Sequence, residues 1–367
     1  MGPFAAYRRV VVHVLALVCV AIEPARAWAI PAFGHAYAIS CQKCHSVIPH
    51  LNAFGAAFAA NGYRIPGVQP GPAIPISVKT NLAYSSDVDP HGLPKAIVDE
   101  IELLSAGTIG ARTSYFVEQY LVDGGEHGST RDGWLAFRLS GDGARVPLVA
   151  AAGSFTLPLP VDPETFRISA RHYALFDQTV GSNPFNFFDP KIGAQLRVGN
   201  ALAGSSVTFV VAPGHDQQSG LQTRGTDAMA YVQHAAGPFT VSAYRYGGER
   251  PIAPRVLDRF FRDGVGLTYT SRRWTSESVL QTGWDSNAGV GGVATGGGFT
   301  QLRYDFSPRL FALARYEGTQ DARGVARDGV LLLGMRPAHV ARVTIEDVIA
   351  HAPRRGHTLN LQYTVGY

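Results

Sequence analysis

Apolar and polar residues alternate along much of the chain. The last segment, 357–367, shows this most clearly, because Leu359, Leu361 and Tyr363 are separated by polar residues. Strict alternation gives a β-strand one apolar and one polar face. We therefore predict an all-β region over residues 76–367.

Strand-like segments of about ten residues can be placed throughout this region. They cover residues 76–85, 97–110, 111–123, 131–140, 146–155, 190–199, 204–213, 225–236, 237–248, 260–271, 274–284, 294–306, 308–318, 327–337, 339–349 and 357–367. Their connections alternate between short and long, as in transmembrane barrels. The pattern predicts an all-β transmembrane β-barrel of about 16 antiparallel strands. A β-sandwich or a propeller is the alternative fold, because alternation alone does not distinguish them.

The register of these strands predicts which charged side chains face the lumen. A charge that faces lipid at the midplane costs about 2–4 kcal/mol for Arg or Lys, so the charged residues of the spans should point inward. These residues are Arg303, Asp305, Arg315, Arg342 and Glu346. Their simplest interpretation is a solvated pore wall.

Two predicted outer loops have unusual side chains. Residues 156–189 include the aromatic residues Phe166, Tyr173, Phe176, Phe185, Phe187 and Phe188. This loop either folds into the barrel and constricts it, caps the surface, or contains a further strand pair. Another predicted loop is flanked by Arg250, Arg255, Arg259 and Arg262. We interpret that group as an ordinary solvated loop, with contact to lipopolysaccharide or an anionic solute as the alternative.

Composition supports β structure and excludes other classes. The 367 residues include 41 Gly and 23 Pro, a density that long helices do not tolerate. Only 16% of the residues are charged, against about 25% in an ordinary soluble domain. The hydrophobic content of 46% and the net charge of only +4 exclude disorder. No stretch after residue 30 approaches the roughly 18 consecutive apolar residues of a spanning helix.

Residues 1–27 have the three parts of a secretory signal peptide. Arg8 and Arg9 form the basic start, an apolar run follows, and Ala25-Arg26-Ala27 has the pattern of a cleavage site. Export together with a predicted barrel indicates the bacterial outer membrane. Cleavage removes three Arg and one Glu, so the net charge falls from +4 to +2, which does not suit a nucleic-acid binder.

The two cysteines that remain after cleavage form the strongest chemical signal. Cys41, Cys44 and His45 make up a Cys-x-x-Cys-His motif. This motif attaches c-type haem, with both thiols bound to the haem and the His on the iron. A thioredoxin-like pair would need a βαβ context, which the sequence lacks, and a zinc site would need a second Cys or His pair nearby. We expect one covalent haem c.

The residues after the motif predict a helix that packs on the haem. Pro49 suits its first turn. Leu51, Phe54 and Phe58 recur at helical spacing, and Asn61-Gly62 ends the helix.

The predicted monohaem cytochrome c domain spans residues 28–66, and a Pro- and Gly-rich linker spans 67–75. The second axial ligand of the iron has two candidates, His35 and His50, and an open iron is the alternative. An imidazole ligand would give a lower redox potential than Met.

The N-terminal motifs resemble those of outer-membrane monohaem c-type cytochrome–porin fusions of the iron-oxidase type. The likeness rests on Cys41-Gln-Lys-Cys-His45, on Pro49-His-Leu-Asn-Ala-Phe-Gly55 and on Asn61-Gly-Tyr63, within about residues 30–63. The resemblance implies a haem on both cysteines, the adjacent His as iron ligand, and a C-terminal barrel. Only three residues separate the haem His from the proline here, fewer than in that family.

These features lead to one functional hypothesis and two rivals. We expect electron transfer across the outer membrane, from an extracellular reductant such as Fe(II) to a periplasmic cytochrome or another electron carrier. The protein would then be an Fe(II):cytochrome c oxidoreductase or a plain electron carrier, with no further catalytic residue. One rival is a solute porin with a haem-bearing plug or redox sensor, and the other is a haem enzyme with open iron. Porin-like barrels are often trimers, so a homotrimer is a further hypothesis.

Overall fold

The computed structural model describes residues 32–65, 67–71, 76–88, 94–141, 144–200, 204–215, 222–253, 256–289, 291–321, 323–338, 340–352 and 356–366. The predicted signal peptide, the final Tyr367 and part of the predicted linker lie outside these residues. Within the described residues, no helix has both the length and the apolar character needed to cross a membrane.

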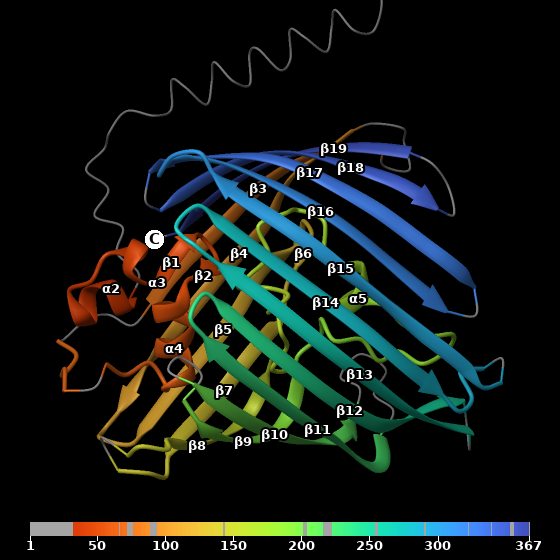
Figure 1. The fold of residues 1–367 in the computed structure, drawn as a ribbon, viewed down its shortest axis with the longest axis horizontal. Helices are drawn as coiled ribbons and strands as arrows, with labels where there is room; N and C mark the ends of the chain where they lie inside the picture. The colour runs from red at the N-terminus through yellow and green to blue at the C-terminus, as the bar shows by residue number, and fades with distance from the viewer. Residues whose placement is uncertain are drawn as a thin grey trace, which may run out of the picture.

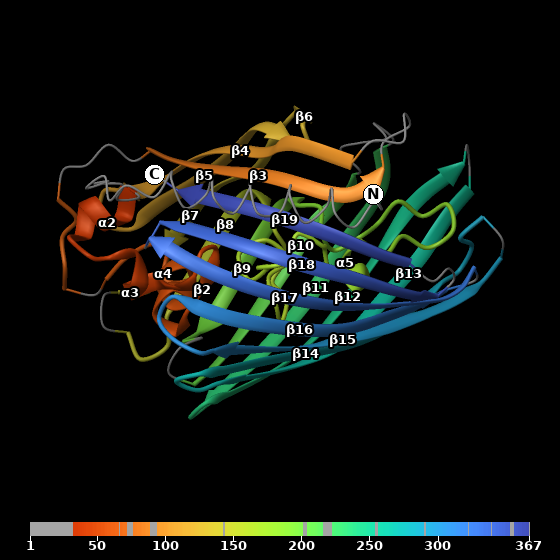
Figure 2. The ribbon, with the colours of Figure 1, turned by 90° about the horizontal axis from the view of Figure 1, so that it is seen from above.

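A closed antiparallel β-barrel makes up the chain from residue 76 onward (Figure 1, Figure 2). The short β6 and the following β7 both pair with β5 and form one strand of the ring, so the barrel has sixteen strands, as predicted. β19 closes the ring against β3, where Tyr363 lies opposite Leu82. The strands are β3 (Ile76–Val88), β4 (Pro94–Ile109), β5 (Thr113–Asp123), β6 (Glu126–His127), β7 (Thr130–Arg138), β8 (Leu148–Phe155), β9 (Lys191–Gly199), β10 (Ser205–His215), β11 (Gln222–Ala236), β12 (Phe239–Ala253), β13 (Val256–Thr270), β14 (Trp274–Asp285), β15 (Val293–Asp305), β16 (Leu310–Asp321), β17 (Gly324–Ala338), β18 (Ala341–Ala352) and β19 (Gly356–Gly366).

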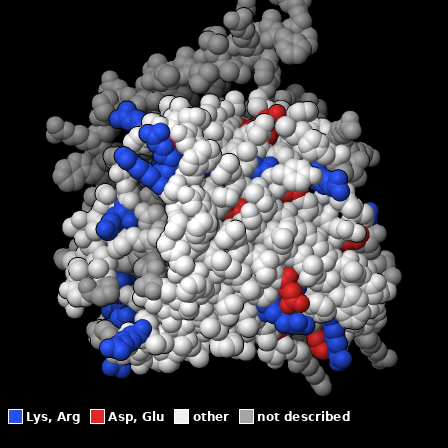
Figure 3. Space-filling model, viewed as in Figure 1, with Lys and Arg blue, Asp and Glu red and all other residues white. Residues whose placement is uncertain are grey.

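The two faces of the wall follow the predicted alternation. On β15, Leu302 is 41% exposed on the outer surface, whereas its neighbour Arg303 is 4% exposed. Arg315, Arg342 and Glu346 are buried in the same way. Few charged side chains interrupt the outer surface between the two ends (Figure 3). The predicted inward direction of these charges is therefore confirmed.

The N-terminal segment lies at the end of the barrel where several strands are joined by short turns. Helix α2 (Ala32–Tyr37), the single turn α3 (Cys41–Cys44) and α4 (Ala53–Ala60) gather there (Figure 1). Arg64 donates to the Gly110 carbonyl (2.7 Å) and the Thr113 carbonyl (2.8 Å) at the turn between β4 and β5. We call this the motif end, and the opposite end of the barrel the loop end.

The prediction of outer loops at 249–259 and 319–326 is wrong, because strands extend through most of both segments. β12 continues to Ala253 and β13 begins at Val256, while β16 continues to Asp321 and β17 begins at Gly324. Arg259 and Arg323 are exposed, whereas some of the other polar residues that suggested a loop face the lumen and find charged partners there. Arg250, for example, is 2% exposed and lies 2.6 Å from a carboxylate oxygen of Asp227.

The connection 156–189 folds into the lumen, the first of its three predicted arrangements. It contains the short helix α5 (Ala174–Asp177) and an isolated bridge between Val180 and Asn183, and no further strand pair is described in it. Figure 2 shows α5 inside the outline of the barrel. Its apolar side chains join those of the wall in one core that includes Leu157, Val161, Tyr173, Leu175, Phe176, Phe185 and Phe187.

Candidate functional site

The two cysteines lie on a single helical turn at the motif end. Positions three apart share one face of a helix, so Cys41 and Cys44 lie on the same side of α3. Cys41 packs against the barrel residues Val340, Ala341 and Val365. Both thiols are free and half-buried, and burial raises the pKa of each.

α4 packs closely against this turn at Gly55. A Cβ added to Gly55 would lie 2.1 Å from the Cys44 carbonyl oxygen, which is backbone and cannot rotate away. Glycine at this position therefore allows the helix to approach the motif.

His45 is oriented by a hydrogen bond within the same segment. Its Nδ1 lies 2.9 Å from the Pro49 carbonyl oxygen. A carbonyl only accepts, so Nδ1 carries the proton and the lone pair of Nε2 is available. Burial lowers the pKa of His45, which keeps the imidazole neutral near pH 7. Iron-ligating histidines have this tautomer and this kind of partner, so the residues present fit a proximal haem ligand.

The segment after the motif begins as a hairpin, not as a helix. β1 (His45–Val47) pairs with β2 (His50–Leu51), so the predictions that Pro49 starts the helix and that Leu51 belongs to it are wrong. The helix starts later because Asn52 is its N-cap: the Asn52 side chain accepts from the Gly55 amide at 2.9 Å. Phe54 and Phe58 do lie on α4, and the helix ends at Asn61, as predicted.

An aromatic cluster that sequence reasoning missed joins this segment to the barrel. The Phe58 ring packs edge-on against Phe33 (centroids 5.0 Å apart) and Tyr37 (5.3 Å). Tyr63 stacks on Phe33 at 4.5 Å and on the barrel residue Trp134 at 5.8 Å. No periodicity connects these residues, because they belong to separate elements.

The hairpin 45–51 enters the lumen from the motif end. Val47 is 1% exposed and packs with Phe311 and Leu332 of the wall and with Ile168 of the connection 156–189. The ring of Phe166 lies edge-on to that of His50, with centroids 4.7 Å apart. The two segments that enter the barrel from opposite ends therefore meet inside it.

The structure describes the surroundings of only one of the two candidates for the distal ligand, His50. Both ring nitrogens of His50 have protein partners: Nε2 lies 3.2 Å from Glu277 Oε1, and Nδ1 lies 2.8 Å from Ser46 Oγ. The side chain of His35, on α2, lies outside the described residues. The distal ligand stays a prediction. Among the described residues, no group of three or more His, Cys, Asp or Glu side chains is placed to hold a metal ion.

The charged side chains of the wall hold the connection 156–189. Glu346 accepts from the amides of Ala170 and Arg171, both at 3.0 Å, and Glu317 accepts from the Ala174 amide at 3.0 Å. Arg315 donates to the Ser169 hydroxyl and to the carbonyls of Arg171 and His172.

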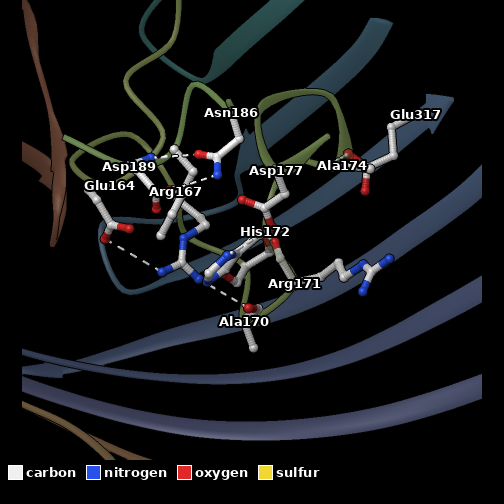
Figure 4. A network of polar contacts seen from close by, with 12 residues as sticks. Glu164, Arg167, Ala170, Arg171, His172, Ala174, Asp177, Asn186, Asp189 and Glu317 are labelled. Carbon is white, nitrogen blue, oxygen red and sulfur yellow. Dashed lines mark hydrogen bonds and ion pairs between the residues drawn. The ribbon is translucent and has the colours of Figure 1, made fainter. Parts of the chain in front are cut away.

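The connection also supplies charged groups of its own. Figure 4 shows Arg167 directed at Glu164 and at the Ala170 carbonyl. Arg250 and Arg262, predicted in a solvated loop, are buried against Asp227 and Asp285. The interpretation of the inward charges as a solvated wall is therefore wrong, because they are bonded to an inserted segment or to other side chains of the wall.

Comparison with solved structures finds porins. An anion-selective porin from Comamonas acidovorans matches with a TM-score of 0.60 and 11% identity, over 80% of this chain and 98% of the porin. OmpF of Salmonella typhi in complex with daunomycin matches with a TM-score of 0.60 and 13% identity, over 80% and 97% of the two chains. The outer membrane channel DcaP of Acinetobacter baumannii gives 0.56 and 11%, over 80% and 96%. No known family and no curated protein matches the sequence. At such low identity, these matches establish a porin-like outer-membrane β-barrel fold.

Proposed function

We propose that this protein carries electrons across the bacterial outer membrane through one haem c bound to Cys41 and Cys44. The observation that carries the proposal is the geometry of His45. Its protonated Nδ1 is held by the Pro49 carbonyl, which leaves Nε2 available as a ligand, and His45 directly follows the helical turn that carries both thiols. The remainder of the hairpin enters a closed barrel, the one β architecture that crosses lipid without unpaired backbone.

The chain's own residues would prepare the site for the haem. When bound, the haem supplies a one-electron ferric/ferrous couple, whose potential depends on ligation, burial and nearby hydrogen bonds. Gly55 lets α4 pack on the motif, and Phe54 and Phe58 supply apolar surface. Pro49 orients the His45 ring. Val47 and its neighbours exclude water from the hairpin.

The proposed direction of electron flow is inward. An extracellular reductant such as Fe(II) would deliver an electron at the loop end, and a periplasmic cytochrome or other carrier would accept it at the motif end. The iron-oxidase resemblance supports Fe(II) as the donor, and the long connection 156–189, which starts from the loop end as an extracellular loop would, supports a periplasmic motif end. A homotrimer is part of the proposal, because one of the solved barrels of this fold is described as a trimer form.

The decisive experiment is haem reduction in intact cells by external Fe(II). We expect the purified protein to carry one covalent haem and to be reduced in cells, whereas a chain with Cys41→Ala and Cys44→Ala should lose the covalent haem band. Absence of covalent haem in the unaltered chain, or haem that external Fe(II) never reduces, would contradict the proposal.

A solute porin with a haem-bearing plug is the second candidate, and the porin fold favours it. Liposome swelling separates the two functions. Solute flux through the unaltered protein supports the porin. A barrel impermeable to sugars but reducible from outside supports the electron carrier.

A further inference from the structure

Two arginines of the barrel wall, Arg303 buried and Arg336 half-buried, hold the residue that follows His45. Arg303, on β15, donates to the Ser46 hydroxyl through Nη1 and to Thr275 Oγ1 through Nη2, both at 3.2 Å. Arg336, on β17, donates to the Ser46 carbonyl through Nη1. The hydroxyl and the carbonyl of Ser46 are thus engaged by guanidinium groups from the wall.

Asp305 joins these two arginines. Its Oδ1 lies 2.6 Å from Arg336 Nη2, and its Oδ2 lies 3.3 Å from Arg303 Nε. Hydrogen bonds from charged donors are shorter and stronger than neutral ones. They are also sensitive to truncation, since removing one partner leaves the other buried and unpaired. The three side chains therefore form a connected group near the motif end of the barrel.

We propose that Arg303, Arg336 and Asp305 act as a clamp that positions His45 through Ser46. Fixing the hydroxyl and the carbonyl of Ser46 fixes the backbone from which the imidazole extends, because the two residues share a peptide bond. The proposal rests on the proposed function, since the position of His45 matters most when it is an iron ligand. The clamp residues act through Ser46 and are positioning residues.

Hydrogen exchange tests the clamp without any haem. In the full-length chain with Cys41→Ala and Cys44→Ala, we expect Arg303→Gln and Arg336→Gln to accelerate amide exchange in residues 45–51 several-fold and to leave 168–174 unchanged. Arg315→Gln is the matched control, because Arg315 is equally buried and holds the other inserted segment. It should accelerate exchange in 168–174 alone.

The haem-bearing protein supplies a second readout. Loss of a positive charge beside the iron ligand should shift the haem potential downward in Arg303→Gln. Arg303→Lys should keep the potential but lose part of the exchange protection, because lysine retains the charge without the planar fork.

The outcomes separate the two proposals. Unchanged exchange in 45–51 for both glutamine variants overturns the clamp. Accelerated exchange in the glutamine variants, together with an unaltered chain that never acquires haem, supports the clamp and contradicts the proposed function. Accelerated exchange with an unchanged potential in haem-bearing Arg303→Gln overturns the link to His45.

A second inference rests on the charge at the motif end. The exposed cations there lie on α3 and on the connections between strands: Lys43, Arg112, Arg145, Arg272, Arg273 and Arg309. Residues 28–75 contain no Asp or Glu. Figure 3 shows Lys and Arg gathered on the side where Figure 1 places α2, α3 and α4. The opposite end carries both signs, as in the 2.8 Å pair of Arg323 with Asp321.

We infer that the motif end docks an acidic soluble electron carrier. This rests on the proposed function, because docking here brings a carrier beside Cys41 and Cys44. Complementary charge raises the rate of encounter and selects the partner, and the attraction weakens as salt rises.

Binding to protein in neutral phosphatidylcholine nanodiscs tests this docking face. We expect acidic plastocyanin to bind at low salt and to dissociate at high salt, and basic mitochondrial cytochrome c not to bind. A chain with Arg272→Glu, Arg273→Glu and Arg309→Glu should lose binding, whereas Arg323→Glu at the loop end should keep it.

Three results would overturn the docking face: no binding of the acidic carrier, equal binding of the basic one, or loss of binding when the discs contain anionic phosphatidylglycerol. The last result would assign these cations to lipid headgroups. Because the assay measures binding, it also works on a chain without haem, so failure of the haem proposal is seen separately.

Discussion

The two segments that enter the barrel are held in opposite ways. The connection 156–189 brings its own apolar residues, and Phe176, at 0% exposed, lies in a core shared with the wall. The hairpin 45–51 contributes only one largely buried apolar side chain, Val47, and otherwise depends on polar contacts with the wall.

The two kinds of contact therefore have different roles: apolar burial stabilises the barrel, whereas directional hydrogen bonds position the hairpin. Apolar burial is non-directional and scales with area, so the long connection belongs to the core that holds the barrel together. Charge-assisted hydrogen bonds are directional, so they place the hairpin accurately while contributing little to the stability of the barrel. The segment next to the Cys-x-x-Cys-His motif is the one placed by directional bonds.

The largest expected effect tests the stabilising role of the connection. Phe176→Ala should destabilise the protein by about 3–5 kcal/mol, the usual cost of truncating a fully buried Phe. Unfolding of the detergent-solubilised barrel by denaturant measures this. Phe306→Ala, at a position 50% exposed in the turn between β15 and β16, is the control and should change stability little. Equal losses in both variants would contradict the shared core.

A smaller effect is expected where α4 packs against the Cys-x-x-Cys-His motif. Gly55→Ala should cost about 1–3 kcal/mol locally, because overpacking must push α4 away from the Cys44 carbonyl. Faster amide exchange in residues 44–55 and a lower yield of covalent haem would show this. Ala53→Ser, at an exposed position of the same helix, should leave both readouts unchanged. If Gly55→Ala leaves global unfolding and local exchange unchanged, the close packing on the motif is not required.

The smallest expected effect is a dependence of local stability on pH that is confined to the connection 156–189. Burial by itself would raise the pKa of Glu164, but the guanidinium groups of Arg131 and Arg167, each 3.6 Å away, outweigh it and hold that pKa below its ordinary value of 4.5. A carboxylate with a depressed folded pKa contributes stability above its unfolded pKa and loses it as the pH falls further.

Exchange in residues 162–170, normalised to the intrinsic rate, should therefore rise as the pH falls below about 4.5. Exchange in 45–51 should rise less over the same range. Glu164→Gln should reduce the rise in 162–170. If the variant responds to acid as strongly as the unaltered chain, Glu164 is not the titrating group.

Much of the fold could be predicted because its patterns involve residues that are close together in the sequence. A strand repeats every two residues, so Leu302 and Arg303 show their opposite directions from their order alone. The Cys-x-x-Cys-His motif is equally local, as is the helix stop at Asn61. The start of α4 was missed because the prediction used Pro49 as the first turn and overlooked Asn52 as the N-cap.

The extension of the strands into 249–259 and 319–326 was missed because these segments are polar. Polarity predicts exposure only when no buried partner exists, and Arg250 has such a partner in Asp227. That partner lies on a different strand, so nothing near Arg250 in the sequence announces it.

The sequence by itself determined most of the strands, their two faces and the spacing of the motif residues, because each depends on near neighbours. Only the tertiary structure decided what fills the lumen and what each inward charge contacts. Arg303 and Ser46 are 257 residues apart, and His50 and Glu277 are 227 apart. Such pairs arise only when the barrel closes and brings distant strands around the inserted segments, so no local pattern records them.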